Sequence, residues 1–361
     1  MKITSIQLNH FRNYNELSLE LDGGINILYG NNAQGKTNIL EAVYVCGTGK
    51  SHRNSKDREM IGFDSEEAHI KAHIQKEYTL DRIDIHLKKN KSKGIAVNGI
   101  PIKKTSELFG FMNVVVFSPE DLQLIKNGPS ERRRFIDLEL CQLDKLYVHH
   151  LINYNKVLAQ RNQLLKELSF RSDYEDMLDI WDLQLVNYGC KIIEIRNKFL
   201  QQLNEIVQIK HNIISGGKET LQVIYEPNVT EENFATQLEK NRERDKKQRV
   251  TLVGPHRDDI MLTINNIDIR KYGSQGQQRT AALSLKMAEI ELVKKIIKDS
   301  PILLLDDVLS ELDFNRQNQL LNCIDGIQTI ITCTGVDDFI HHRFHMDKIF
   351  HVENGTVVKH N

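Results

Sequence analysis

A glycine-rich loop at residues 30–37 constrains the fold more than any other feature of this 361-residue chain. Its sequence, GNNAQGKT, fits the pattern G-x4-G-K-[S/T]; it follows the strand-like segment INILY and precedes a predicted helix that carries Ile39 and Leu40. Glycines in such a loop let backbone N–H groups turn toward phosphate oxygens, and the helix N-terminus adds its positive dipole end. A strand, a phosphate-binding loop and a helix in this order predict an α/β nucleotide-binding domain.

Two side chains of this loop have distinct predicted roles. Lys36 is expected to reach the β- and γ-phosphates of ATP, and Thr37 to place its hydroxyl on Mg²⁺. ATP and Mg²⁺ are therefore the expected cofactors. The residues expected to contact the nucleotide are Gly30, Asn31, Asn32, Ala33, Gln34, Gly35, Lys36 and Thr37.

A very apolar segment, PILLLDD at residues 301–307, is the second half of the predicted site. A strand here delivers Asp306 at its carboxyl end, where the carboxylate can hold Mg²⁺. Asp307 follows at once and is a candidate to polarise the attacking water. Taken alone, an aspartate at a strand end is more often a cap, but a P-loop enzyme needs such a strand. Lys36, Asp306 and Asp307 are therefore the predicted catalytic residues.

Two further segments indicate that the site is shared between two chains. YGSQGQQR at residues 272–279 precedes a predicted long helix, and its Ser274, Gly276 and Gln277 have the layout of the signature that grips the γ-phosphate in ABC-type ATPases. The alternative is a serine-capped helix with a flexible glycine start. SELD at residues 310–313 matches the D-loop of the same class, with Asp313 as its acidic residue. This order predicts a nucleotide sandwiched in a homodimer.

Periodicity divides the chain into two predicted domains. Residues 1–118 and 250–361 form a discontinuous α/β ATPase head with a mixed sheet, and residues 119–249 form a compact helical arm lobe. Breaks are expected near Ser169–Asp173 and at 215–217. Strands are expected at 221–225, at 329–333 and at several places within 66–117, where Asn98-Gly99 predicts a type I′ hairpin.

Composition excludes few function classes. The net charge of −1 means that any DNA contact must come from local basic patches. No apolar run reaches the roughly 18–20 residues of a membrane span, and the N-terminus does not resemble a signal peptide, so a cytoplasmic location is expected. The five cysteines form no CxxC pair and are expected to be reduced.

Longer strings give a more specific resemblance. LNHFRNY near the N-terminus, VVVFSPEDLQLIKNGPSERRRFID at 114–137, TLVGPHRDD at 251–259 and LLLDDVLSELD at 303–313 resemble the RecF family of SMC-like ABC ATPases. The resemblance implies an ATP-dependent homodimer on gapped or single-strand–double-strand junction DNA, with slow DNA-stimulated hydrolysis. It also implies cooperation with RecR and RecO in loading a recombinase onto single strands.

The resemblance suggests further site residues and two departures. Arg12 and Asn13 are candidates to contact the nucleotide; four others could lie near nucleotide or DNA or be structural, namely His52, Arg53, His256 and Arg257. In PEDLQ, either Glu120 or Gln123 could stand for the Q-loop glutamine of transporters. The switch histidine is missing, which leaves Thr332 or Thr334 as γ-phosphate sensors and predicts slow hydrolysis.

Candidate DNA contacts come from two basic clusters, and the first is favoured because it lacks acidic neighbours in sequence and phosphate binding needs uncompensated charge. The first cluster is Lys88, Lys89, Lys91, Lys93, Lys103 and Lys104, and the second is Arg132, Arg133 and Arg134. The run at 239–249 interleaves acidic residues and is typical of a solvated helix face. The main alternative function is the nucleotide-binding subunit of a transporter. An arm-bearing chromosome ATPase would need long heptads, and a non-catalytic scaffold would not need Asp306-Asp307.

Overall fold

A computed structural model describes residues 1–167, 176–335 and 346–360 of the chain. The chain forms two compact units: Met1–Asp121 with Glu289–Asn361, and Leu122–Ala288. The boundary differs from the expected one, because residues 250–288 belong with the helical unit. The physical reason is strand pairing, since β10 (Asp259–Ile264) pairs antiparallel with β9 (Leu221–Glu226) from within the predicted arm lobe.

The first unit contains an antiparallel sheet in which side chains alternate between a buried and an outward face. The strand order is β2-β1-β4-β5-β6-β7. Its strands are β1 Lys2–Phe11, β2 Tyr14–Glu20, β4 Glu67–Gln75, β5 Leu80–Lys88, β6 Gly94–Val97 and β7 Ile100–Ile102. Asn98 (φ 54°) and Gly99 (φ 80°) join β6 to β7, and two positive φ angles are what a type I′ turn requires. The hairpin prediction is confirmed.

A second sheet of the same unit is mixed, as predicted, and has the order β15-β14-β3-β13-β12-β8. Its strands are β3 Ile25–Tyr29, β8 Val114–Phe117, β12 Ile302–Asp306, β13 Thr329–Cys333, β14 Lys348–Glu353 and β15 Thr356–His360. All neighbours are parallel except the antiparallel pair β14–β15. All five residues of β12 are buried, which agrees with its nearly uninterrupted apolar sequence.

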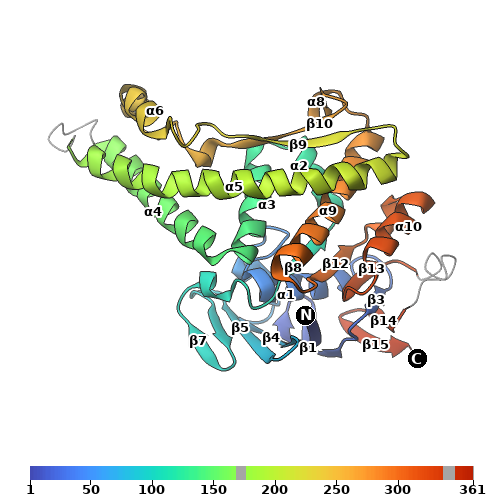
Figure 1. Ribbon diagram of the computed structural model, residues 1–361. Helices are drawn as coiled ribbons and strands as arrows, with labels where there is room; N and C mark the ends of the chain where they lie inside the picture. Colours follow the sequence, from blue (N-terminus) through green and yellow to red (C-terminus); the bar gives the residue numbers. More distant parts are fainter. Residues whose placement is uncertain (168–175, 336–345, 361) are drawn as a thin grey trace. The chain divides into compact units, whose positions relative to one another are not determined.

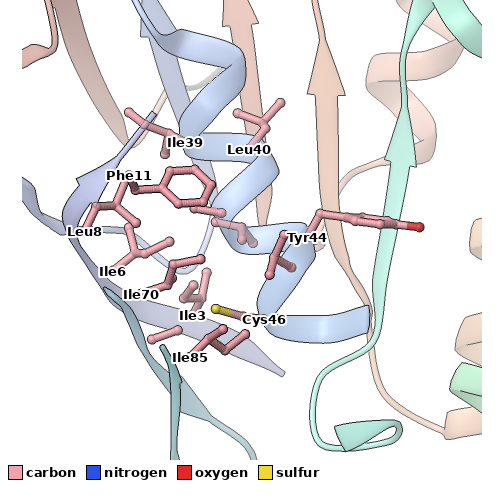
Figure 2. Close-up of a cluster of buried hydrophobic side chains, with 14 of the residues drawn as sticks. Ile3, Ile6, Leu8, Phe11, Ile39, Leu40, Tyr44, Cys46, Ile70 and Ile85 are labelled. Carbon is pink, nitrogen blue, oxygen red and sulfur yellow. The ribbon is translucent and has the colours of Figure 1, made fainter. Parts of the chain in front are cut away.

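The helix α1 (Lys36–Thr48) joins the two sheets into one hydrophobic core. Figure 2 shows Ile39, Leu40 and Cys46 of α1 in one cluster of buried side chains with Phe11 and Ile70 of the antiparallel sheet. The same cluster includes buried residues of the mixed sheet, so burial of α1 on both sides fixes where the preceding loop can lie. Short helices complete the unit: η1 Asp57–Met60, η2 Thr105–Leu108, η3 Pro119–Asp121, η6 Leu309–Glu311 and α10 Phe314–Cys323.

The second unit is mainly helical, with the long helices α4 and α5 labelled in Figure 1. It also has a three-stranded sheet in the order β11-β10-β9. Its other elements are α2 Leu122–Lys126, α3 Pro129–Leu143, α4 Lys145–Glu167, α5 Met177–Ser215, α6 Phe234–Lys240, α7 Arg242–Gln248, η5 Pro255–Arg257, β11 Ile267–Asp268, α8 Ile269–Tyr272 and most of α9 Gln275–Ile297. The helix α5 has 39 residues and ends before Gly216 and Gly217, which both have positive φ. The break expected at Ser169–Asp173 lies outside the described residues.

No helix among the described residues is long and apolar enough to cross a membrane.

Buried ion pairs hold the helical unit together. The side chain of Arg161 on α4 is fully buried; its Nε donates to Asp182 on α5 at 2.5 Å, and its Nη1 donates to Asp245 on α7 at 2.7 Å and to Thr251 at 2.9 Å. Asp245 is fully buried as well, and burial raises its pKa despite the ion pair. One guanidinium therefore ties three segments together, and part of the charged run at 239–249 faces inward.

Replacing Arg161 with Met should destabilise this unit strongly. The change keeps the length of the side chain but leaves Asp182 and Asp245 without their shared cation, so the free energy of unfolding should fall by about 3–5 kcal/mol. Denaturant unfolding of the full chain, followed by circular dichroism, measures the change. A matched control is Lys191→Met, which removes only an exposed pair with Glu194 and should leave the unfolding midpoint unchanged. Equal effects of the two substitutions would contradict the role of the Arg161 network.

Candidate nucleotide-binding site

The glycine-rich loop lies where three parallel strands end. It leaves β3 after Tyr29, next to β13, which ends at Cys333, and β13 in turn neighbours β12, which ends at Asp306. The backbone N–H of Gly30 donates to the carbonyl of Cys333 at 3.3 Å. Ligands of open α/β sheets bind outside the carboxyl ends of the strands, so the topology brings the loop and the apolar Asp-Asp segment to one edge.

Two glycines of the loop are required by its surroundings. Gly30 has φ 149°, and a Cβ there would lie 2.3 Å from the carbonyl oxygen of Val352. Gly35 has φ 115°, and a Cβ there would lie 2.6 Å from Asn13 Nδ2 and 2.8 Å from the Tyr14 hydroxyl. Neither position accepts a side chain without displacing its neighbours. The loop conformation is thus imposed by the protein itself.

Lys36 is held over the loop. Its side chain is buried, and its ammonium donates to the carbonyl oxygens of Gly30 at 2.7 Å and Asn31 at 3.0 Å. A buried ammonium at the N-terminus of α1 gives the loop a fixed positive charge beside backbone N–H groups. This arrangement fits the phosphates of a nucleotide.

Thr37 and Asp306 meet, as the metal prediction requires. The Thr37 hydroxyl donates to Asp306 Oδ1 at 2.8 Å, and the Thr332 hydroxyl donates to the same oxygen at 2.8 Å. Asp306 is buried at the end of β12. A threonine hydroxyl and a carboxylate converging on one point are oxygen ligands of the kind that Mg²⁺ takes beside nucleotide phosphates. These two residues fit the ion.

Asp307 stands beside this pair in a different environment. Its φ is 51°, and its backbone N–H donates to the Thr332 hydroxyl at 2.9 Å. Burial raises the pKa of the Asp307 carboxyl, against the opposing charge of Lys36 and in the same direction as the charge of Asp306. A carboxylate with a raised pKa is a stronger base, which suits a group that polarises water. Thr332 links Asp306 to Asp307; the structure records no corresponding bond for Thr334 among the described residues.

The guanidinium of Arg12 is hydrogen-bonded to other residues of the protein. Its guanidinium donates to both carboxylate oxygens of Glu41 at 2.7 Å, to the Glu59 carbonyl at 2.6 Å and to the Ser55 hydroxyl at 2.6 Å. Glu41 is fully buried; burial favours its neutral form, yet hydrogen bonds from Arg12 and Ser51 lower its pKa overall. Glu41 lies four residues after the end of the loop. It is a charged residue in the apolar sequence of α1, and that pattern could have identified it as a functional residue. A nucleotide contact by Arg12 stays a prediction.

Asn13 supports the loop directly. Its Nδ2 donates to the carbonyl of Gln34 at 2.9 Å, and its Oδ1 accepts from Asn38 at 2.8 Å. The side-chain oxygen of Gln34 in turn accepts from the backbone N–H of Asn354 at 2.7 Å. Asn13 therefore lies at the loop and bonds to protein atoms, and a nucleotide contact by Asn13 stays a prediction.

His52 lies near the site. The sequence alone did not assign it a single role. Both ring nitrogens are buried and have no hydrogen-bond partner among the described residues, and the ring meets Tyr44 edge-on at 5.4 Å. Burial lowers the pKa of His52, while the charges of Asp306, Glu41 and Glu120 oppose that shift. The side chain thus lies in the field of Asp306. Glu120 shares this unit, whereas Gln123 belongs to the other. The Arg53 guanidinium donates a hydrogen bond to the side-chain oxygen of Asn38 at 3.5 Å.

The signature segment and the D-loop residue both cap helices. The Ser274 hydroxyl accepts from the N–H of Gln277 at 3.2 Å, and the Gln277 side chain accepts from the N–H of Ser274 at 2.9 Å, a reciprocal capping box at the start of α9. Gly276 lies in the first turn of that helix. Asp313 caps α10 by accepting from the N–H of Arg316 at 3.0 Å. The capping alternative is therefore present, and the γ-phosphate role of these residues stays a prediction.

The first cluster of candidate lysines was predicted to have no acidic neighbours, and this prediction is wrong for three of them. Lys88 lies 3.8 Å from Glu67, Lys89 lies 3.2 Å from Glu66, and Lys93 lies 3.0 Å from Asp57. Their acidic partners come from distant segments, which the local sequence cannot reveal. Within the described part of the chain, no such pair is recorded for Lys91, Lys103 and Lys104, which stay candidates for DNA contact.

Two further candidates have structural contacts inside the second unit. Arg132 is buried and pairs with Asp259 at 2.6 Å, so it is not a free basic residue, and Arg133 donates to the Asp258 carbonyl at 2.7 Å.

His256 contacts the Tyr154 hydroxyl at 2.6 Å and the carbonyl of Thr251 at 3.0 Å. Burial lowers the pKa of His256 to about 4. It is a half-buried histidine that is neutral at neutral pH.

Comparisons with known proteins show the family of this chain. A model of the RecF/RecN/SMC N-terminal domain matches residues 2–358. The DNA replication and repair protein RecF of Lachnoclostridium phytofermentans is 60% identical over 359 residues, which cover 99% of this chain and 100% of that protein. The chain belongs to the RecF family. A RecF of Clostridium perfringens is 46% identical, covering 99% of each chain.

Solved structures extend the likeness to the fold. The recombination mediator protein RecF bound to ATP is 38% identical, with a TM-score of 0.94 over 100% of this chain and 98% of that one. An SMC head domain from Pyrococcus furiosus, at 16% identity and a TM-score of 0.57, shares the fold. The predicted ATPase-head fold is confirmed. The family is one of DNA replication and repair, and the comparisons do not support the transporter alternative.

The neutral His256 predicts a pH dependence of stability. Its folded pKa of about 4 lies below the ordinary 6.5, so between these values only the unfolded state binds the proton. The contribution of neutral His256 to the free energy of unfolding is fully present above pH 6.5. It is lost as the pH falls toward 4, by up to about 1.4 kcal/mol per pH unit. Between pH 7.5 and 5.5, the free energy of unfolding of the wild type should fall by about 1 kcal/mol more than that of His256→Gln. Identical losses would show that His256 is not held neutral.

Proposed function

We propose that the chain is an ATP-dependent DNA-binding protein of recombinational repair and replication restart that acts as an ATP-gated homodimer. The observation that carries the ATP part is the meeting of Thr37 and Asp306 beside the buried Lys36 at one sheet edge. This arrangement supports Lys36 as the residue that neutralises β- and γ-phosphate charge, with Thr37 and Asp306 as the Mg²⁺ ligands. A bound Mg²⁺ would supply electrostatic stabilisation of the transferred phosphoryl group.

The hydrolytic step rests on Asp307. Its raised pKa and its backbone bond to Thr332 support a role in taking a proton from, or polarising, the attacking water. Thr332 links Asp306 and Asp307 and is the better of the two threonine candidates for sensing the γ-phosphate. Among the described residues, no histidine stands at the end of β13, so we expect slow hydrolysis, with DNA as its stimulant.

The shared site rests on two helix N-termini. The first turn of α9 presents N–H groups around Ser274 and Gly276, and Asp313 begins α10. Helix N-termini are ready anion sites. We infer that Ser274, Gly276, Gln277 and Asp313 of one chain complete the nucleotide site of a second chain, so that ATP couples dimerisation to DNA binding.

The partners follow from the family. The similar solved protein is described as a recombination mediator in the RecFOR pathway, which supports RecR and RecO as partners of this chain. Gapped or junction DNA is the expected substrate, held through phosphates rather than bases. Lys91, in the turn between β5 and β6, and Lys103 and Lys104, directly after β7, are the remaining candidate contacts.

Asp307→Asn should trap the ATP-bound state. The amide keeps the shape of the side chain but cannot accept the proton, so ATP turnover should fall by at least about a hundredfold while ATP binding persists. Turnover and light scattering, each with and without gapped duplex DNA, measure both effects. Wild-type turnover should rise with this DNA, and the variant should remain dimeric in ATP. Lys36→Arg, which keeps the charge, is the companion variant that should bind some ATP without hydrolysis.

Two results would overturn the proposal in separable ways. Unchanged wild-type turnover and mass upon addition of gapped DNA would remove the DNA function while leaving the ATPase intact. Undiminished turnover in Asp307→Asn would remove Asp307 from the hydrolytic step while leaving the DNA function intact.

A further inference from the structure

Three ligand-type side chains meet on the outward face of the antiparallel sheet. Glu67 and His69 lie on β4 and His86 lies on β5, and one donor atom from each lies within 4.8 Å of the other two. This is the one such group of histidine, cysteine and acidic residues in the described ranges 1–167, 176–335 and 346–360. None of the three belongs to the glycine-rich loop or to the Asp306-Asp307 pair.

Strand pairing holds these residues together. His69 is directly opposite His86 in the antiparallel register of β4 and β5, and Glu67 precedes His69 by two residues, on the same face. The two imidazole rings stack with centroids 3.9 Å apart, and His86 Nε2 lies 2.5 Å from the Glu67 carboxylate. Because the backbone ladder fixes all three Cα positions, the cluster is preformed rather than dependent on a loop.

The cluster borders a groove. The cavity has a volume of about 520 Å³ and is lined by residues of β1, β4, β5, β6 and β7. Small residues on β6, Gly94 and Ala96, make the hollow beside His69 and His86. Its other lining residues are both polar and apolar: Gln7, Asn9, Lys71 and Asp84 with Ile70, Ile85, Ile95 and Pro101. The cluster therefore borders an open groove of mixed character.

We propose that Glu67, His69 and His86 bind a divalent first-row transition-metal ion, with Zn²⁺ as the representative ion. Two imidazoles and one carboxylate are an established donor set for Zn²⁺, which takes them at about 2.0–2.2 Å. Imidazole nitrogen favours Zn²⁺, Ni²⁺ and Cu²⁺ over Mg²⁺ and Ca²⁺. Three protein ligands leave one position of a tetrahedral site for water on the groove side. The three donor atoms lie within 4.8 Å of one another.

The competing arrangement is a purely structural one. Glu67 serves as a hydrogen-bond acceptor for His86, and Lys88 lies 3.8 Å from the same carboxylate and opposes a bound cation. Lys71 lies opposite Asp84, whose carboxylate also pairs with Arg82 at 2.8 Å. Metal binding by the cluster requires Glu67 to exchange these partners for the ion, and the two arrangements predict different responses to substitution.

Zn²⁺ titration of the full chain, by calorimetry in a buffer that does not bind metal, tests the proposal. The wild type should bind one Zn²⁺ per chain, and Co²⁺ should give the visible absorption of a tetrahedral nitrogen–oxygen site. His86→Ala and His69→Ala should each weaken Zn²⁺ binding by at least about tenfold, with unchanged circular dichroism. ATP turnover in Mg²⁺ should be unaffected, so the site is testable apart from the proposed ATPase.

A matched control is His73→Ala. His73 lies on the same strand and face, and its ring bonds to Ser5 at 3.0 Å, outside the cluster. Its loss should leave Zn²⁺ affinity unchanged. The proposal is overturned if the wild type binds no stoichiometric Zn²⁺, or if His73→Ala weakens binding as much as His86→Ala does.

Discussion

The parallel alignment of β3, β13 and β12 is the constraint on which the candidate site depends. Three consecutive neighbours end at Tyr29, Cys333 and Asp306, and they deliver segments nearly 300 residues apart in sequence to one edge. The hydrogen bond from Thr37 to Asp306 closes this arrangement. α1 is fixed by burial between two sheets, so its first turn has little freedom to move away. Phosphate-binding backbone and metal-binding oxygen atoms are therefore prepared by the fold.

Thr332 extends this arrangement. Its hydroxyl donates to Asp306 and accepts from the backbone of Asp307, so a single side chain positions both acidic residues. The two carboxyls differ in environment: Asp306 is bonded by two hydroxyls, whereas burial raises the pKa of Asp307. Neighbouring carboxyls with different environments suit different tasks. The proposed division between a metal ligand and a base follows from that difference.

Much of the head could be predicted from sequence because its signals are local. The loop at 30–37 and the apolar run before Asp306 each identify a strand end without reference to the rest of the chain, and Asn98-Gly99 identifies its own turn. The failures are nonlocal. Lys88, Lys89 and Lys93 looked uncompensated because their acidic partners lie on other segments. Residues 250–288 resembled head sequence, but the pairing of β10 with β9 was not visible in periodicity. The His69–His86 contact likewise depends on strand register.

The central claim is that each nucleotide site takes its loop from one chain and its signature from another. Mixing two inactive variants tests it most directly: Lys36→Ala, which lacks the phosphate-binding ammonium, and Ser274→Arg, which blocks the start of α9. A mixed dimer holds one intact site, formed by the loop of the Ser274→Arg chain and the signature of the Lys36→Ala chain. ATP turnover should therefore reappear on mixing and depend on the ratio of the two variants. If the mixture stays as inactive as its parts, the site is not shared between chains.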